Sequence, residues 1–271
     1  MGLLVLLLLL AATGLAFRSL RARHRRATRR AEVFDDLLTL DVSGKAFEPH
    51  SLDALPDRAA AWLRNALAPG QPVSRTADIR YAGHLRAAPE DDWIPFRARE
   101  RVAAGKGFIW EGRVAALGPL FLAGAEWFRD TRYESRFELQ GLLTVTREAG
   151  GGDLRSARAR FLLEHVWLPG CLLPELGAAW TESGEDRLAV VPAGWDVPLG
   201  LEIGPGGVLR SASVLRFRPE TGRMVNFGMA VEREEVFDGH RLPSRISGGW
   251  GFGTDDYVEM FRASVESVRY F

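Results

Sequence analysis

The sequence predicts a mainly β (α+β) protein, built on one large curved antiparallel sheet or half-barrel with an inserted helix and an N-terminal helix. Three observations predict this fold class. From Ile79 onward, apolar residues recur at every second position, as in a strand with one buried face. Short turn sequences separate these segments, which favours antiparallel pairing because parallel strands need a long crossover. One stretch with helical spacing interrupts the alternation near the middle of the chain.

Residues 1–30 indicate a membrane anchor with a basic flank. An apolar run extends from Leu3 to Phe17, and seven arginines follow between Arg18 and Arg30. This run is short for a bilayer, which takes roughly 17–25 residues, but flanking arginines can reach the interface. We therefore expect a single transmembrane helix, and we expect both parts to contact membrane lipid. Because Lys and Arg favour the cytoplasmic side, the main domain is expected there; the alternative is a signal peptide cleaved near Gly14–Ala16 and an exported domain.

Residues 31–54 are interpreted as a connector, and residues 55–271 as a single β-rich domain. This domain is expected to begin with a helix. Leu55–Asp57 form a start signal, and apolar residues recur at helical spacing from Ala59 to Leu67 before Pro69–Gly70 ends the pattern. One face of this helix should cover the sheet.

Two groups of strands are expected, with a helix between them. Asp153 is expected to cap this central helix, which should end near Trp167–Pro169 because a proline disfavours helical geometry in the residue before it. A sheet of roughly ten strands tends to curl, and a helix across its mouth would enclose an apolar hollow. The turn Asp238–Gly239 is a strong hairpin signal in the second group. The segments that alternate are 79–83, 94–98, 108–112, 119–130 and 133–147, and then 188–191, 197–203, 208–217, 225–235, 242–250 and 257–270.

The charge balance of the body disfavours a nucleic-acid partner. The chain has 35 basic and 35 acidic residues, and seven of the basic residues lie in the arginine block, which leaves 28 basic against 35 acidic residues elsewhere. Binding to phosphates normally requires a basic surface. Cys171 is the single cysteine, which excludes an internal disulfide and a thiolate zinc site.

The sequence shows no assembled catalytic set, metal site or cofactor motif. A Gly-x-Ser-x-Gly nucleophile motif is absent. The acidic pairs Asp91–Asp92 and Asp255–Asp256 fall in predicted loops, and an oxygen-ligand metal site would need several more donors. The histidines include no pair at the i, i+4 spacing of helical metal ligands; they are His24, His50, His84, His165 and His240.

Several motifs resemble a family of uncharacterised bacterial membrane-anchored proteins, a domain of unknown function. The resemblance runs from about residue 55 to the end, and its most specific part is Phe161–Pro174, which reads FLLEHVWLPGCLLP. Trp93–Ala98, Gly107–Trp110 and Gly249–Trp250 add to it. The expected architecture is also loosely similar to the curved-sheet lipoprotein carriers of the bacterial envelope, a similarity that implies an apolar cavity for acyl chains.

These observations favour a membrane-tethered binding module that holds an apolar or lipid-like ligand in a curved-sheet cavity. One alternative is a hydrolase-like enzyme that acts on a membrane-derived substrate, with Glu164 or a loop aspartate as base; another is a structural or partner-docking domain. Aromatic side chains commonly line ligand pockets. For Glu164 and His165 the sequence favours a structural role over ligand binding, with Glu164 bonded to the backbone or an arginine and His165 capping the helix end. The candidate ligand-binding residues are Trp110, Glu164, His165, Trp167 and Trp250.

Overall fold

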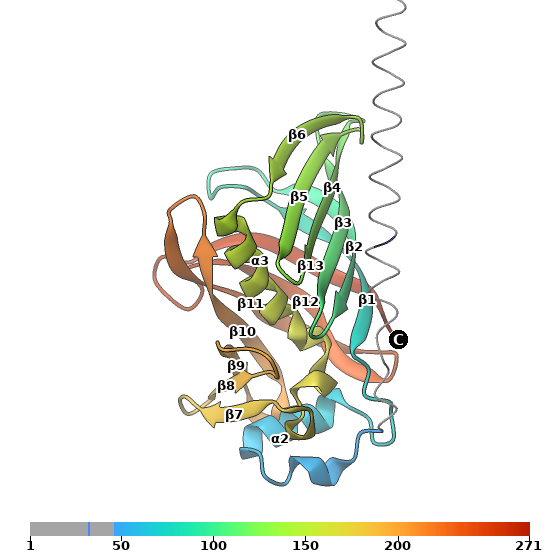
Figure 1. Ribbon diagram of the computed structural model, residues 1–271, viewed down its shortest axis with the longest axis vertical. Coiled ribbons are helices and arrows are strands. Elements are labelled where there is room, and N and C mark those ends of the chain that lie inside the picture. Colours follow the sequence, from blue (N-terminus) through green and yellow to red (C-terminus); the bar gives the residue numbers. More distant parts are fainter. Residues whose placement is uncertain (1–31, 33–45) are drawn as a thin grey trace, which may run out of the picture.

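The computed structural model describes residue 32 and residues 46–271; the predicted anchor, Leu3–Phe17 with its Arg18–Arg30 flank, lies outside the described residues. Within the described part, no helix combines the length and the apolarity that crossing a membrane requires. The predicted fold class is confirmed, because one curved antiparallel sheet dominates the structure (Figure 1).

The sheet has 13 strands in the order β6-β5-β4-β3-β2-β1-β13-β12-β11-β10-β9-β8-β7. Their bounds are β1 (Thr76–Leu85), β2 (Ile94–Ala103), β3 (Gly107–Ala115), β4 (Phe121–Arg129), β5 (Arg132–Leu139), β6 (Leu143–Glu148), β7 (Ala179–Glu182), β8 (Arg187–Val191), β9 (Leu199–Ile203), β10 (Leu209–Arg218), β11 (Arg223–Phe237), β12 (His240–Trp250) and β13 (Val258–Tyr270). The helices are α2 (Asp57–Ala66) and α3 (Gly151–Leu163), and the 3₁₀ turns are η1 (Pro49–Leu52), η2 (Glu164–Trp167), η3 (Pro169–Leu172), η4 (Pro174–Leu176) and η5 (Pro205–Gly207).

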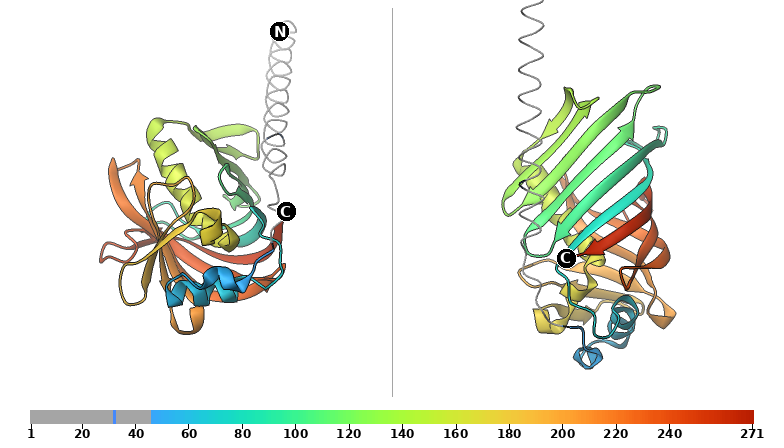
Figure 2. Two further views of the ribbon diagram at one scale, coloured as in Figure 1. Left: turned by 60° about the horizontal axis from the view of Figure 1, so that its bottom comes forward. Right: turned by 90° about the vertical axis from the view of Figure 1, so that its right-hand side faces the viewer.

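The first and last strands lie side by side at the centre of the sheet. β1 pairs with β13 in an antiparallel register that runs from Ala77 opposite Tyr270 to Leu85 opposite Phe261. This pairing leaves β6 and β7 as the two edges, although they are consecutive strands in the sequence. The connection between them therefore crosses from one edge to the other, and Figure 2 shows the sheet curving around α3.

Helix α3 occupies this crossing, and it contacts β4 and β5 on one side and β10 on the other. Asp153 does not lie at the helix cap, as predicted, but at the third helical position, where its carboxylate accepts the backbone N–H of Gly150 at 2.8 Å. This capping interaction satisfies one backbone donor at the start of the helix. The α-helix ends at Leu163, and 3₁₀ turns continue through Trp167 to Leu172.

The lower end of the half-barrel is covered by α2 and by the chain that precedes it (Figure 1). Trp62 and Leu63 of α2 are buried in the main core. Phe47 and Leu52, which fall in the predicted connector, are buried in the same core, and the Phe47 N–H donates to the Gln71 carbonyl at 2.8 Å. The packed body thus extends upstream of the predicted domain start at residue 55.

The strand count exceeds the expected ten or so for two reasons: β7 was not among the predicted segments, and one predicted segment contains a turn. Residues 133–147 form β5 and β6 rather than one continuous stretch. Gln140 and Gly141 take φ values of 53° and 68° in the turn between them. A positive φ is uncommon for glutamine, so the residue types did not predict this turn.

Candidate functional site

A cavity of about 280 Å³ lies between α3 and the strands that face it. Eight strands contribute to its wall, together with the end of α3 and the turn η2. The wall is mostly apolar, but a group of ionisable side chains gathers along the α3 side. The lining residues are Tyr81, Leu85, Phe96, Glu100, Trp110, Glu126, Arg160, Leu163, Glu164, Trp167, Arg216, Phe227, Met229, Ile246, Phe261, Ala263 and Val265.

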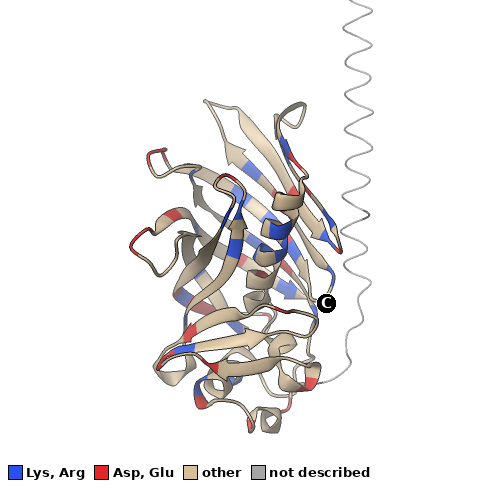
Figure 3. Cartoon of the chain, turned by 60° about the vertical axis from the view of Figure 1, so that its left-hand side comes forward, with Lys and Arg blue, Asp and Glu red and all other residues tan. Residues whose placement is uncertain are grey.

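Arg160 is the centre of this ionisable group. Its Nη2 donates to Glu100 Oε1 at 2.8 Å and its Nε to Glu164 Oε1 at 3.2 Å. A third ion pair joins its Nη1 to Glu126 Oε2. The three carboxylates come from β2, β4 and η2, so Arg160 ties the crossing segment to the N-terminal half of the sheet. Figure 3 shows charged positions on α3 and on the strands around it.

The surroundings of Arg160 shift the pKa values of its partners. Only 2% of Glu100 is exposed. Burial, with the neighbouring Glu164 carboxylate, raises the pKa of Glu100 to about 8. Burial also raises the pKa of Glu164, whereas for Arg160 the three carboxylates outweigh burial and raise the guanidinium pKa. Three carboxylates share Arg160, and this excess of negative charge favours a proton on one of the acids at neutral pH, because unpaired charge away from water is costly.

Two further donors hold the acids in place. The Tyr81 hydroxyl donates to Glu100 Oε2 at 2.7 Å, and the Trp167 Nε1–H donates to Glu164 Oε2 at 3.1 Å. Both oxygens of Glu164, the residue considered as a base for a hydrolase-like enzyme, therefore accept hydrogen bonds. The ionisable groups along the described cavity wall can form ion pairs, bind an anion and exchange protons.

Three of the predicted ligand-binding residues line this cavity. Trp110 reaches it from β3, where its ring packs against Phe137 with centroids 6.1 Å apart. Glu164 and Trp167 reach it from η2, joined by their hydrogen bond. Sequence motifs more than fifty positions apart thus meet at one wall of the cavity.

The other two predicted residues lie outside the lining. His165 is buried on the far side of the helix end, where Nδ1–H donates to the carbonyls of Phe161 and Leu162 at 3.1 and 3.2 Å. Burial lowers the pKa of His165 to about 4, so the ring is neutral near pH 7. Trp250 packs edge-on against Phe227, with ring centroids 4.9 Å apart, and so supports a lining residue from behind.

The charged lining residues other than Glu164 were not identified from the sequence. A signal for them was present, because Glu100 and Glu126 occupy positions in phase with the apolar residues of their strands. Phe96, Ala98 and Val102 share a strand face with Glu100 by alternation. A charged residue at a strand position that faces the same side as apolar residues indicates a buried, paired group. This pattern therefore indicates the cavity.

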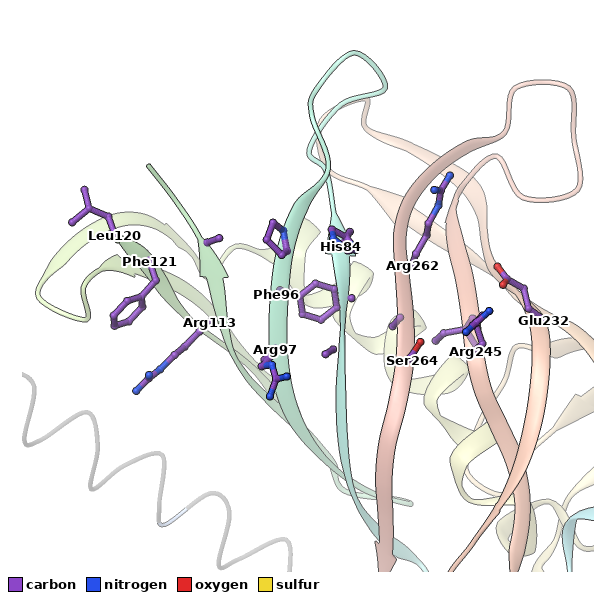
Figure 4. A pocket seen from close by; sticks show the side chains of 16 residues that line it. His84, Phe96, Arg97, Arg113, Leu120, Phe121, Glu232, Arg245, Arg262 and Ser264 are labelled. Carbon is purple, nitrogen blue, oxygen red and sulfur yellow. The ribbon is translucent and has the colours of Figure 1, made fainter. Parts of the chain in front are cut away.

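A larger groove of about 790 Å³ involves several of the same strands, but it is open and has a different character. Its lining combines apolar residues such as Phe96 and Phe121 with four exposed arginines: Arg97, Arg113, Arg245 and Arg262. Figure 4 shows these side chains spread over several strands rather than converging on one point. The smaller cavity is less open and collects the ion-paired groups around Arg160, so we take this cavity as the candidate site.

A model of a family of unknown function, DUF6544, matches residues 45–263. The chain belongs to the DUF6544 family. The match confirms the predicted membership in a family of unknown function, and it begins ten residues upstream of the predicted start of the resemblance. No curated protein matches this DUF6544 chain.

Several solved structures are similar to this DUF6544 protein. A LolA superfamily protein from Nitrosomonas europaea is 12% identical, with 79% of this chain and 92% of that chain covered and a TM-score of 0.43. A DUF1329 family protein from Desulfovibrio piger is 12% identical, with coverage of 73% and 86% and a TM-score of 0.42. A domain from Vibrio parahaemolyticus, described as an outer-membrane lipoprotein-sorting protein, is 9% identical, with coverage of 72% and 85% and a TM-score of 0.38.

Proposed function

We propose that this protein is a membrane-tethered binding module that shelters an apolar, lipid-like ligand in the cavity between α3 and the sheet. The cavity itself carries the proposal. Its volume of about 280 Å³ lies near the lower end of ligand pockets, roughly 300–1,000 Å³, which are mostly apolar with a few placed polar groups. The wall away from α3 has this apolar character; it includes Met229, Ile246, Phe261, Ala263 and Val265.

Filling the cavity should remove bound lipid. Ala263 lies on β13 between Gly83 and Ile246, and it is 4% exposed. We expect Ala263→Phe to place a ring in the cavity and to lower the amount of co-purifying lipid at least about fivefold, because the ring would occupy the space that the ligand needs. The measurement is mass spectrometry of lipids extracted from the gently purified full chain.

Ser264→Phe is the matched control. Ser264 follows Ala263 on the same strand, is exposed, and points to the opposite face of the sheet. This variant should retain the lipid content of the wild type. A wild-type protein that carries no lipid, or an Ala263→Phe variant that folds and carries as much as the wild type, would contradict the proposed cavity.

The tether is supported by the N-terminal sequence. Leu3–Phe17 is apolar and the Arg18–Arg30 block follows it, an arrangement that favours a body on the cytoplasmic side. The full chain should remain in the membrane pellet after alkaline carbonate extraction, which releases peripheral proteins. A Leu6→Arg/Leu8→Arg variant should be released, because each charge at the centre of a membrane helix costs about 2.5–3.5 kcal/mol on insertion scales. Release of the wild-type chain would exclude the tether and leave the cavity proposal standing.

A further inference from the structure

Arg216 is a second arginine in the cavity lining, where it is partly buried, and its partners differ from those of Arg160. It lies on β10 and its Nε donates to the Ser156 hydroxyl of α3 at 2.8 Å. Its guanidinium lies over the rings of Phe227 and Trp250, at 4.6 and 5.1 Å from their centroids. Within residues 46–271 no carboxylate forms an ion pair with Arg216, and its two terminal nitrogens have no hydrogen-bond partner.

The nearby carboxylates already accept hydrogen bonds from other residues. Both oxygens of Glu100 and both oxygens of Glu164 accept hydrogen bonds, from Arg160, Tyr81 and Trp167. One oxygen of Glu126 is likewise bonded to Arg160. The three acids therefore pair with Arg160. Among the described residues, the polar partner of Arg216 is the neutral hydroxyl of Ser156, and Arg216 lines the cavity.

A partly buried cation of this kind favours an anionic ligand. Burial lowers the pKa of Arg216 to about 10, so the guanidinium keeps its charge at neutral pH. Arginine presents paired N–H donors that match the two oxygens of a carboxylate or phosphate. The aromatic rings beneath Arg216 hold the guanidinium plane in position, as cation–π contacts do. Trp250, which lies outside the cavity lining, acts here as a positioning residue.

We propose that the cavity binds a single-chain amphiphile with an anionic head group, a carboxylate or a phosphate monoester, whose head is held by Arg216. The chain then lies along the apolar wall formed by β11, β12 and β13, where Met229, Ile246 and Phe261 line the cavity. The cavity of about 280 Å³ suits one acyl chain better than a two-chain lipid. This inference rests on the proposed function, and it adds the charge and the position of the ligand head.

Brominated chains provide a direct test, because bromine quenches tryptophan fluorescence at short range and Trp110 and Trp167 line the cavity. The full chain is placed in phosphatidylcholine nanodiscs and titrated at pH 7 with 11-bromoundecanoic acid and with 11-bromoundecanol. Wild type should bind the acid at least about tenfold more tightly than the alcohol, since hydrogen bonds to ionised groups are roughly twice as strong as neutral ones. Arg216→Gln should reduce the affinity for the acid to that for the alcohol and leave the alcohol affinity unchanged, while Arg216→Lys should retain part of the preference.

Arg210→Gln is the control on the same strand. Arg210 is 48% exposed and pairs with Asp186 at 3.4 Å on the surface, so its removal should change neither affinity. Competition by decanoate and by decyl phosphate separates the two head groups, and the stronger competitor identifies the class. Equal affinities of the wild type for acid and alcohol would overturn the role of Arg216 and leave the proposed function intact. Failure of both brominated chains to quench would overturn the proposed function itself.

Discussion

Replacing Arg160 with methionine is expected to lower the free energy of unfolding by about 3–5 kcal/mol, because removal of one partner from a buried ion pair leaves uncompensated charge. Arg160 is 16% exposed and pairs with Glu100, Glu126 and Glu164. The variant leaves these carboxylates in the cavity wall without a cation that pairs with them. Methionine keeps most of the side-chain volume, so the loss measures charge more than packing. Urea unfolding of the full chain, followed by circular dichroism, gives the value.

Arg158→Met is the matched control for this prediction. Arg158 lies on the same helix, it pairs with Asp196 at 3.1 Å, and its guanidinium lies over the Trp195 ring at 5.3 Å. Arg160 likewise lies over an aromatic ring, that of Phe108 at 4.6 Å. The difference is burial, because Arg158 is 52% exposed. Surface ion pairs contribute about 0–1 kcal/mol, so this variant should lose little stability. If Arg160→Met loses no more than Arg158→Met, the charge cluster does not stabilise the fold.

The strands could be predicted from the sequence because alternation is local. The β12 residues from Leu242 to Trp250 alternate within a single segment, and Asp238–Gly239 gives the preceding turn. The pairing of β1 with β13 could not be predicted in this way. Ala77 and Tyr270 lie opposite each other across almost the whole length of the domain. No turn sequence joins them, so only the closing of the whole sheet brings them together.

The candidate site shows the same division between local and distant information. Trp110, Glu164 and Trp167 belong to sequence motifs that could be recognised, and they line the cavity. Arg160 and Arg216 gave no such signal, because an arginine on a helix or strand is usually solvated. What makes these two arginines unusual is burial by elements distant in the sequence, namely the sheet that curves around α3.

The pH dependence of stability should show the second large effect, through Glu100. The pKa of Glu100 is about 8 in the folded protein and near 4.5 without the burial. Between these two values the folded state holds a proton that the unfolded state has released, so stability falls as pH rises. Each tenfold difference in proton affinity corresponds to about 1.4 kcal/mol. We expect wild type to lose stability steadily from about pH 6.5 to pH 8.

Above about pH 6.5, the change of stability with pH reports on the carboxyl groups rather than on His165. His165 acts in the opposite direction at lower pH, because its folded pKa of about 4 lies below the usual value of 6.5. Below about pH 6.5 the unfolded state binds the His165 proton first, so stability rises with pH there. Glu164, whose pKa burial also raises, adds to the loss at higher pH. Unfolding curves measured at intervals above pH 6.5 therefore report on Glu100 and on the other acids whose pKa burial raises, Glu148, Glu164 and Glu234, with little contribution from His165.

Glu100→Gln should remove most of this loss, because a neutral amide resembles the protonated acid and has no proton to release. Its carbonyl oxygen can still accept from Arg160, as Glu100 Oε1 does at 2.8 Å. The variant should equal or exceed the stability of the wild type at pH 8 and show a smaller slope, with the remainder due to the other acids whose pKa burial raises. Glu175→Gln, at an exposed position of η4, should keep the wild-type slope. An unchanged slope in Glu100→Gln would mean that Glu100 releases its proton as readily when folded as when unfolded, and the cavity would then hold three ionised carboxylates against two arginines.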